Sequence, residues 1–252
     1  MKALYSLFLL ITAVALLAIS APANAAKMDD RIESSAKKSY VFKTYLKNDD
    51  IKIESRDGAV TLTGTVLEES HKSLAEETVA SQPGVKSVDN RLEVKGERPA
   101  EMSDAWLTSK VKSTLLFHRN VSAKTEVNSK DGIVTLRGEA NSTAQKNLTT
   151  EYVKDVKGVK DVVNEMTVLP KGAKKPGRTT GEKIDDSSIT ALVKLTLLNH
   201  VSTSALKTSV TTKNGVVTLS GKAKNRAESN LATKIAKDVN GVKSVKNRMT
   251  IE

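Results

Sequence analysis

The chain has 252 residues, with 40 Lys and Arg against 29 Asp and Glu, a net charge of +11, no cysteine and only 3% aromatic residues. Without cysteine it has neither disulfides nor a lipid attached through an N-terminal cysteine, so any stability outside the cytoplasm must come from core packing. The few aromatic residues offer little for stacking nucleic-acid bases, and we expect no nucleic-acid partner.

The first 25 residues have the pattern of a secretory signal peptide. Lys2 precedes an apolar run from Leu7 to Ile19, which is too short to span a bilayer, and Ala23-Asn24-Ala25 has the small-x-small form of a cleavage site. We expect cleavage between Ala25 and Ala26. The predicted location is the periplasm, with no lipid anchor and no transmembrane helix in the mature chain.

Two sequence blocks each occur three times after the signal peptide. The first reads DGAVTLTG from Asp57, DGIVTLRG from Asp131 and NGVVTLSG from Asn214, and the second begins GVKSV, GVKDV and GVKSV at Gly84, Gly158 and Gly241. Because both blocks shift together along the chain, whole units are duplicated. We predict domains over 27–98, 99–169 and 184–252, each with its own core, with a basic Pro/Gly linker over 170–183. We expect them to be arranged like beads on a string.

Each unit has the same expected order of elements. Apolar residues at three- and four-residue steps predict a first helix, with an N-cap at Ser103 or Asp104 in unit two and at Asp185 or Asp186 in unit three. The adjacent Asp29-Asp30 pair also stands where an N-cap belongs. Two alternating segments joined by Asp-Gly or Asn-Gly then predict a hairpin with a type I′ turn.

A second amphipathic helix follows, and then a final strand. The helix is expected to end before a left-handed glycine, and an asparagine in the strand is expected at a bulge or bend. These glycines are Gly84, Gly158 and Gly241, and the asparagines are Asn90, Asn164 and Asn247. The fold class is therefore α+β: three tandem α-β-β-α-β domains, each a small sheet with one face covered by two helices and a Thr-rich face open to water.

This unit of about 70 residues, with [DN]-G-x-V-T-L-x-G followed by G-V-x-x-V-x-N, resembles the BON domain (bacterial OsmY and nodulation). The whole plan resembles the osmotically inducible periplasmic proteins of that family, which usually have two such units. The resemblance implies modules that bind phospholipid or other envelope components and help maintain the envelope under stress. It implies no catalytic residue, and the matching glycines mark turns and close packing: Gly58, Gly64, Gly84, Gly132, Gly138, Gly158, Gly215, Gly221 and Gly241.

Candidate catalytic groups are few. His118 and His200 occupy matching positions after the first helices of units two and three, whereas His71 stands elsewhere. The pair is either a proton-transfer or metal site or, as we favour, two cations near helix C-termini. Of the pairs Asp29-Asp30, Asp49-Asp50 and Asp185-Asp186, the first and last are interpreted as helix caps, and adjacent residues do not share a helix face as paired catalytic carboxylates would need. We therefore expect no enzyme activity, no catalytic, cofactor or metal site, and no small-molecule substrate.

Charge is concentrated in the third unit, which has eleven Lys and Arg against five Asp and Glu. This excess predicts peripheral binding to an anionic phospholipid surface, mainly through unit three. The candidate lipid contacts are Lys222, Lys224, Arg226, Lys234, Lys237, Lys243, Lys246 and Arg248. The alternative is a multivalent protein-binding or chaperone-like module for envelope proteins. A glycan binder is a third possibility.

Overall fold

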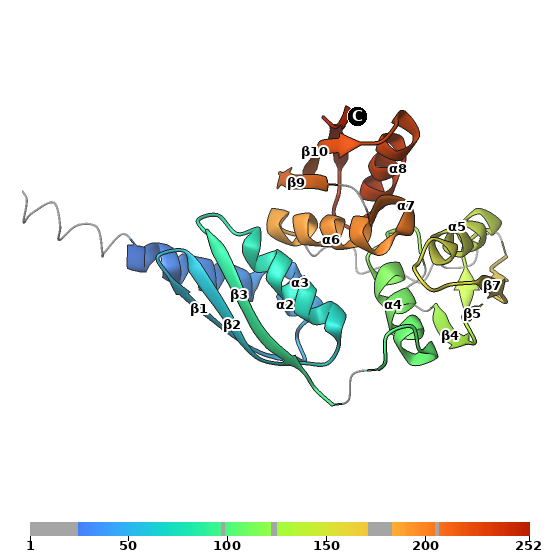
Figure 1. The fold of residues 1–252 in the computed structure, drawn as a ribbon, viewed down its shortest axis with the longest axis horizontal. Helices are drawn as coiled ribbons and strands as arrows, with labels where there is room; N and C mark the ends of the chain where they lie inside the picture. The colour runs from blue at the N-terminus through green and yellow to red at the C-terminus, as the bar shows by residue number, and fades with distance from the viewer. Residues whose placement is uncertain (1–24, 97–98, 122–124, 171–182, 205–206) are drawn as a thin grey trace, which may run out of the picture.

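The computed structural model describes residues 25–96, 99–121, 125–170, 183–204 and 207–252 (Figure 1). The predicted signal peptide, apart from Ala25, and nearly all of the predicted linker lie outside these residues. Ala25 and Ala26, at the expected cleavage site, begin the first described helix, over residues 25–38.

Unit one is one three-stranded sheet with helices on one face. Its elements after the first helix are α2 (Tyr40–Thr44), β1 (Asp50–Arg56), β2 (Ala59–Val66), α3 (Glu69–Ala80) and β3 (Ser87–Val94). Strands β1 and β2 form an antiparallel hairpin, and β3 pairs parallel to β2 in the order β1-β2-β3. Ile53, Val60 and Leu62 point inward, and the residues that alternate with them face outward.

Units two and three repeat this plan. Unit two contains α4 (Asp104–Leu116), β4 (Glu126–Lys130), β5 (Ile133–Arg137), β6 (Glu139–Ala140), α5 (Thr143–Lys154), β7 (Asp161–Asn164) and β8 (Thr167–Val168). Unit three contains α6 (Asp186–Asn199), α7 (Val201–Ser204), β9 (Lys207–Lys213), β10 (Val216–Ala223), α8 (Arg226–Lys237), β11 (Ser244–Asn247) and β12 (Thr250–Ile251). The α+β prediction is confirmed.

The three hairpin turns are of the expected kind and are held by a carboxylate from the first helix. Asp57, Asp131 and Asn214 have φ of 53°, 54° and 54°, and a glycine with positive φ follows each, as a type I′ turn requires. In unit three the carboxylate of Asp186 accepts hydrogen bonds from Asn214 N and Gly215 N. Asp29 and Asp104 do the same in units one and two.

The capping prediction is right for Ser103 and Asp185 and wrong for Asp29. Ser103 and Asp185 are N-caps, since their side chains accept from Trp106 N and Ser188 N. Asp29 is not a cap, because it lies inside the helix over 25–38. Its hydrogen bonds from Ser55 and Gly58 lower the pKa of its carboxyl group, which keeps it an acceptor for the turn.

The asparagine of the last strand ties that strand to the second helix in each unit. Asn164 Oδ1 accepts from Met166 N at 3.0 Å, while its Nδ2 donates to Lys146 O at 2.9 Å and to Thr150 Oγ1. Asn90 and Asn247 make the corresponding bonds. The strand is interrupted after Asn164 and Asn247, as predicted, but β3 continues through Asn90.

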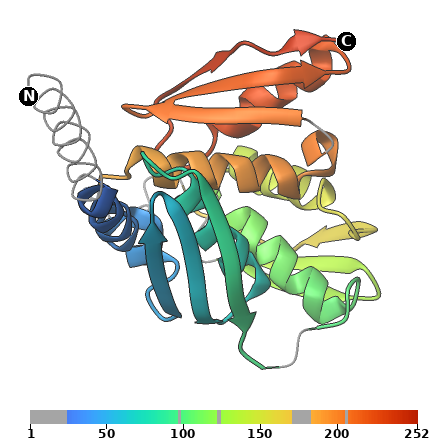
Figure 2. The same ribbon diagram turned by 60° about the vertical axis from the view of Figure 1, so that its left-hand side comes forward.

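The three units pack together, so the expectation of beads on a string is wrong. Buried apolar residues of units one and three form one continuous cluster, and helix α6 lies between the two units (Figure 2). Ser188 Oγ of α6 accepts from Val41 N at 3.1 Å, and Lys194 Nζ lies 2.7 Å from Glu77 Oε2 of α3. Residues 187 to 197 of α6 are buried with the exception of Lys194. A helix apolar on nearly every side needs cover from more than its own sheet.

Gly221 is predicted to tolerate no side chain. It has φ of +125°, and a Cβ there would lie 2.0 Å from the carbonyl oxygen of Lys207 on the neighbouring strand. Gly221→Ala should therefore lower the free energy of unfolding by about 2–3 kcal/mol, measured by urea denaturation. Gly96→Ala is the matched control, since Gly96 also has positive φ but has no neighbour within 4 Å. An equal effect of both substitutions would show that strain in φ, and not the close approach, is responsible.

Asn164→Asp separates the two roles of the asparagine. Aspartate keeps the acceptor for Met166 N but loses the donors to Lys146 O and Thr150 Oγ1 and places a charge beside two acceptors. We expect a loss of about 1–3 kcal/mol in the free energy of unfolding, read from the urea midpoint. No change would contradict a tie between strand and helix at this position.

Candidate functional site

The structure divides the candidate lipid contacts between two surfaces. All eight are exposed. Lys222 and Lys246 are on the outer face of the sheet of unit three, whereas Arg226, Lys234 and Lys237 are on α8, which packs against the opposite face. Lys224, Lys243 and Arg248 lie in the connections at the sheet margins. A flat surface therefore cannot contact all eight at once.

Every charged residue on the outer face of β9, β10 and β11 is a lysine. Strand pairing puts Lys207 opposite Lys222, Lys246 beside Thr218, and Lys213 opposite Val216, all on the face away from the helices. We call these four lysines the basic sheet face. Their remaining neighbours on β9, β10 and β11 are Ser, Thr and Val, with no Asp or Glu. Lys207 and Lys213 were absent from the sequence-based candidates, although the two-residue alternation of β9 would have placed them here.

The corresponding face of unit one carries mixed charge. It carries acidic and basic residues side by side on β1 and β3: Asp50, Lys52, Glu54, Arg56, Asp89, Arg91 and Glu93. Unit two has Glu126, Lys130 and Asp161 at its equivalent positions. On this face, lysine is the one kind of charged residue on β9, β10 and β11 of unit three, with Glu252 following β12 at one end, whereas units one and two carry both signs of charge.

A second cluster lies buried between units two and three. His118 and His200 each follow the first helix of their unit, and both side chains have no exposed surface. His118 forms an isolated β-bridge with Val239 of unit three, and His200 forms one with Val156 of unit two. The histidines that the sequence placed at matching positions are therefore brought together by the packing of their units.

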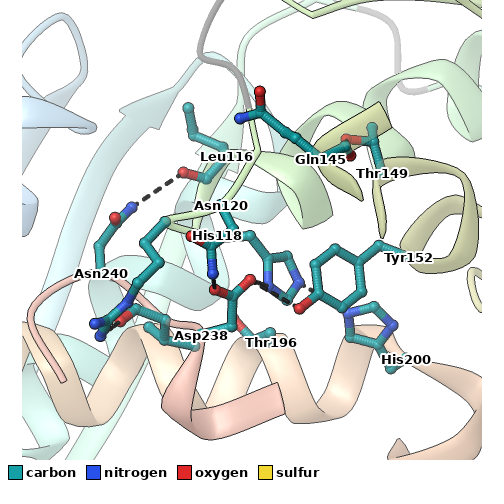
Figure 3. Close-up of polar contacts among 12 residues, drawn as sticks. Leu116, His118, Asn120, Gln145, Thr149, Tyr152, Thr196, His200, Asp238 and Asn240 are labelled. Atoms are coloured by element: carbon teal, nitrogen blue, oxygen red, sulfur yellow. Dashed lines mark hydrogen bonds and ion pairs between the residues drawn. The ribbon is translucent and has the colours of Figure 1, made fainter. Parts of the chain in front are cut away.

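The two imidazoles join two carboxylates in one line of polar contacts. Figure 3 shows His118, His200 and Asp238 of this line, with Tyr152 beside them. His118 Nε2 lies 3.0 Å from His200 Nε2. His118 Nδ1 lies 3.2 Å from Asp238 Oδ2, and His200 Nδ1 lies 3.2 Å from Asp155 Oδ2, the latter poorly aligned for a hydrogen bond. We call these four residues the His–Asp chain.

Further donors fix the two carboxylates. Asn120 Nδ2 and Tyr152 Oη donate to Asp238, the tyrosine at 2.8 Å, while Ser202 N and Oγ donate to Asp155 Oδ1 at 3.0 and 2.6 Å. The Tyr152 ring stacks on His118 with centroids 3.8 Å apart. The contact has an approximate two-fold relation, because each unit supplies one histidine and one aspartate that caps its second helix.

Protonation follows from these contacts. Burial acts to raise the pKa of Asp155, but the adjacent His200 imidazole and the hydrogen bonds from Ser202 outweigh it and hold the pKa below its ordinary value. Burial, with the nearby charge of Asp238, raises the pKa of the Tyr152 hydroxyl, so the tyrosine stays a donor. Asp155 is therefore an ionised acceptor.

His71 lies apart from this cluster. Its Nδ1 is 2.7 Å from Asp49 Oδ2 within unit one. Over the described ranges, no group of three or more His, Cys, Asp or Glu side chains is arranged to hold a metal ion.

Sequence reasoning treated the histidines as separate cations and missed their pairing. Two signals in the repeats could have revealed it. Unit one has no histidine after its first helix, and at the position of Asp155 and Asp238 it has Ser81. The histidine and the aspartate of the contact thus occur together in units two and three, and unit one lacks both.

In the part of the chain that the structure describes, no helix is both long and apolar enough to cross a membrane. The basic sheet face and the His–Asp chain are the two candidate functional sites described above.

Comparison with known proteins identifies the repeats. The BON domain model matches residues 28–96, 103–170 and 185–252. The chain is 33% identical over 198 residues to osmotically-inducible protein Y of Escherichia coli (strain K12), covering 78% of this chain and 95% of that protein. It is 31% identical over 147 residues to the outer membrane lipoprotein DolP of Haemophilus influenzae, covering 58% of this chain and 72% of that protein.

Among solved structures, the chain is similar to CdsD, a structural protein of the type III secretion system of Chlamydia trachomatis. The sequences are 17% identical, the match covers 88% of this chain and 90% of that chain, and the TM-score is 0.24. The family assignment rests on the three matched repeats, which cover most of the sequence. The chain belongs to the BON domain family.

Proposed function

We propose that this protein is a non-catalytic, exported protein of the bacterial envelope, active under osmotic stress in the periplasm, that attaches to anionic phospholipid mainly through unit three. The relatives named for osmotic induction and for the outer membrane support the setting. The predicted signal peptide supports export.

The basic sheet face is the observation that carries the lipid assignment. Its four lysines project from one open face with no acidic side chain among them, whereas the same face of units one and two has mixed charge. Each cation near an anionic membrane contributes about 1 kcal/mol, so four contacts give an attachment of about 4 kcal/mol, which salt weakens. Binding of this strength is peripheral and reversible.

A non-catalytic role is supported by where the titratable groups lie. The His–Asp chain brings four titratable groups together, and both of its histidines are fully buried. A groove of about 450 Å³ runs past its edge, but the lining contains Tyr152, Asp155 and Lys234 and neither histidine.

Charge reversal distinguishes the two basic surfaces of unit three. In the full mature chain, Lys222→Glu with Lys246→Glu removes two contacts of the basic sheet face. We expect partition onto phosphatidylglycerol-containing vesicles to fall about 30-fold or more at low salt, since two contacts of about 1 kcal/mol are lost. Co-sedimentation measures this partition.

Arg226→Glu with Lys237→Glu is the matched control, because it makes the same change in net charge on α8 and should have a much smaller effect. Equal losses in the two double variants would contradict a defined docking face. If the unmodified protein does not sediment with vesicles at any salt concentration, the lipid assignment is wrong, and the multivalent protein-binding alternative becomes the better account.

A further inference from the structure

The His–Asp chain needs one more proton than two neutral histidines carry. Three contacts link its four groups: Asp238 to His118, His118 to His200, and His200 to Asp155, the last being an ion-pair contact of 3.2 Å that is poorly aligned for a hydrogen bond. Each contact sets two acceptor atoms close together, which is repulsive unless one of them carries a proton. Three contacts require three protons, whereas two neutral imidazoles and two carboxylates supply two.

Other proton counts leave a repulsive contact inside the interface. With two protons, either the two Nε2 lone pairs face each other at 3.0 Å or a ring lone pair faces a carboxylate. With four protons, two N–H groups point at each other across the same 3.0 Å. Because both rings are fully buried, water cannot relieve either conflict.

We propose that the contact between units two and three is a binding site for a single shared proton, and that this proton holds the two units together. One histidine is then an imidazolium that donates to the other, and two carboxylates flank the pair. This inference is independent of lipid binding.

The charged groups around the site are compatible with one proton. Asp238 and Asp155 face the imidazoles from the ends of α8 and α5 and favour a positive charge between them. The Arg119 guanidinium donates hydrogen bonds to Val239 O and Val242 O, and Lys234 lines the groove beside Asp155. These two cations disfavour a second proton. Tyr152 is neutral and donates to Asp238.

A shared proton makes the interface strongest at intermediate pH. A solvent-exposed histidine has a pKa of about 6.5. Well below that pH the separated units carry two protons on these histidines against one in the closed form, so opening becomes easier as pH falls. Well above that pH the histidines of the separated units carry no excess proton, whereas the closed form still carries one, so opening becomes easier as pH rises. On each side the equilibrium constant for opening should increase about tenfold per pH unit.

Hydrogen exchange of backbone amides that cross the interface measures this opening. Arg119 N donates to Asp238 O at 2.8 Å, Val201 N to Asp155 O at 2.8 Å, and Asn240 N to Phe117 O at 3.0 Å. In the full mature chain, we expect the protection factors of these amides, corrected for intrinsic exchange, to peak near pH 6.5. They should fall about tenfold per pH unit on both sides.

Amides with bonds inside one unit provide the internal control. Lys160 N donates to Gly132 O and Lys243 N to Gly215 O, so their protection should not follow the bell-shaped curve. A flat profile for the interface amides, or a fall on the acid side alone, would overturn the shared-proton site. A rise in protection on adding Zn²⁺ that a chelator reverses would also overturn it, because a metal ion and not a proton would then join the imidazoles.

Two variants extend the test. In His200→Gln the closed form no longer needs an excess proton, so the alkaline side of the curve should disappear. Tyr152→Phe leaves the three contacts intact and removes only the hydroxyl bond to Asp238, so it should lower protection and keep the bell shape. If His200→Gln does not fold, the curve of the unmodified protein still decides. If the alkaline side persists in a folded His200→Gln, the proposal is wrong.

Discussion

The burial of helix α6 on nearly all sides is the constraint on which the arrangement of the units depends. One side covers the sheet of unit three, and the rest must be kept from water by other parts of the chain. Unit one supplies that cover through α2 and α3, and the ion pair of Lys194 with Glu77 accommodates the one charged residue in this stretch. Units one and three consequently share one apolar core, whereas unit two keeps a separate core and joins them through Phe117 and the contact at His118 and His200.

Within each unit, the features predicted from sequence are those determined by local chemistry. The Asp-Gly and Asn-Gly turns and the caps at Ser103 and Asp185 depend on neighbouring residues, so their sequence patterns were sufficient. The asparagine pattern was not sufficient, because the strand is interrupted after Asn164 and Asn247 but continues through Asn90. The role of Asp186 is different. Its hydrogen bonds reach a turn 28 residues away, and nothing in the local pattern distinguishes it from a cap.

The packing of the units was not predictable in the same way. The expectation of separate domains came from the length of each unit and from its repeated core pattern, which would be complete if each unit stood alone. Unit three departs from this expectation at α6, where residues such as Ala191 and Val193 are fully buried and extend the apolar surface around the helix. Four lysines could have been assigned to the basic sheet face from strand alternation, but only strand pairing shows that Lys207 lies opposite Lys222.

Duplication followed by divergence accounts for both distinctive sites. The same fold position is Glu54 in unit one and Thr211 in unit three, and it is Ser81 in unit one and Asp238 in unit three. Changes at exposed strand positions give unit three a basic face, while changes at helix ends give units two and three a contact that unit one cannot make. Unit three thus differs from the other two in its basic sheet face, and units two and three differ from unit one in the residues of their mutual contact.

Small-angle X-ray scattering of the mature chain tests most directly whether the three units form a single body around α6. At pH 6.5, a compact arrangement of this length predicts a radius of gyration of about 17 Å. Three separate units on extended linkers would give about 25 Å or more. A value in the higher range would contradict the account, because α6 would then expose apolar surface that the structure buries against unit one.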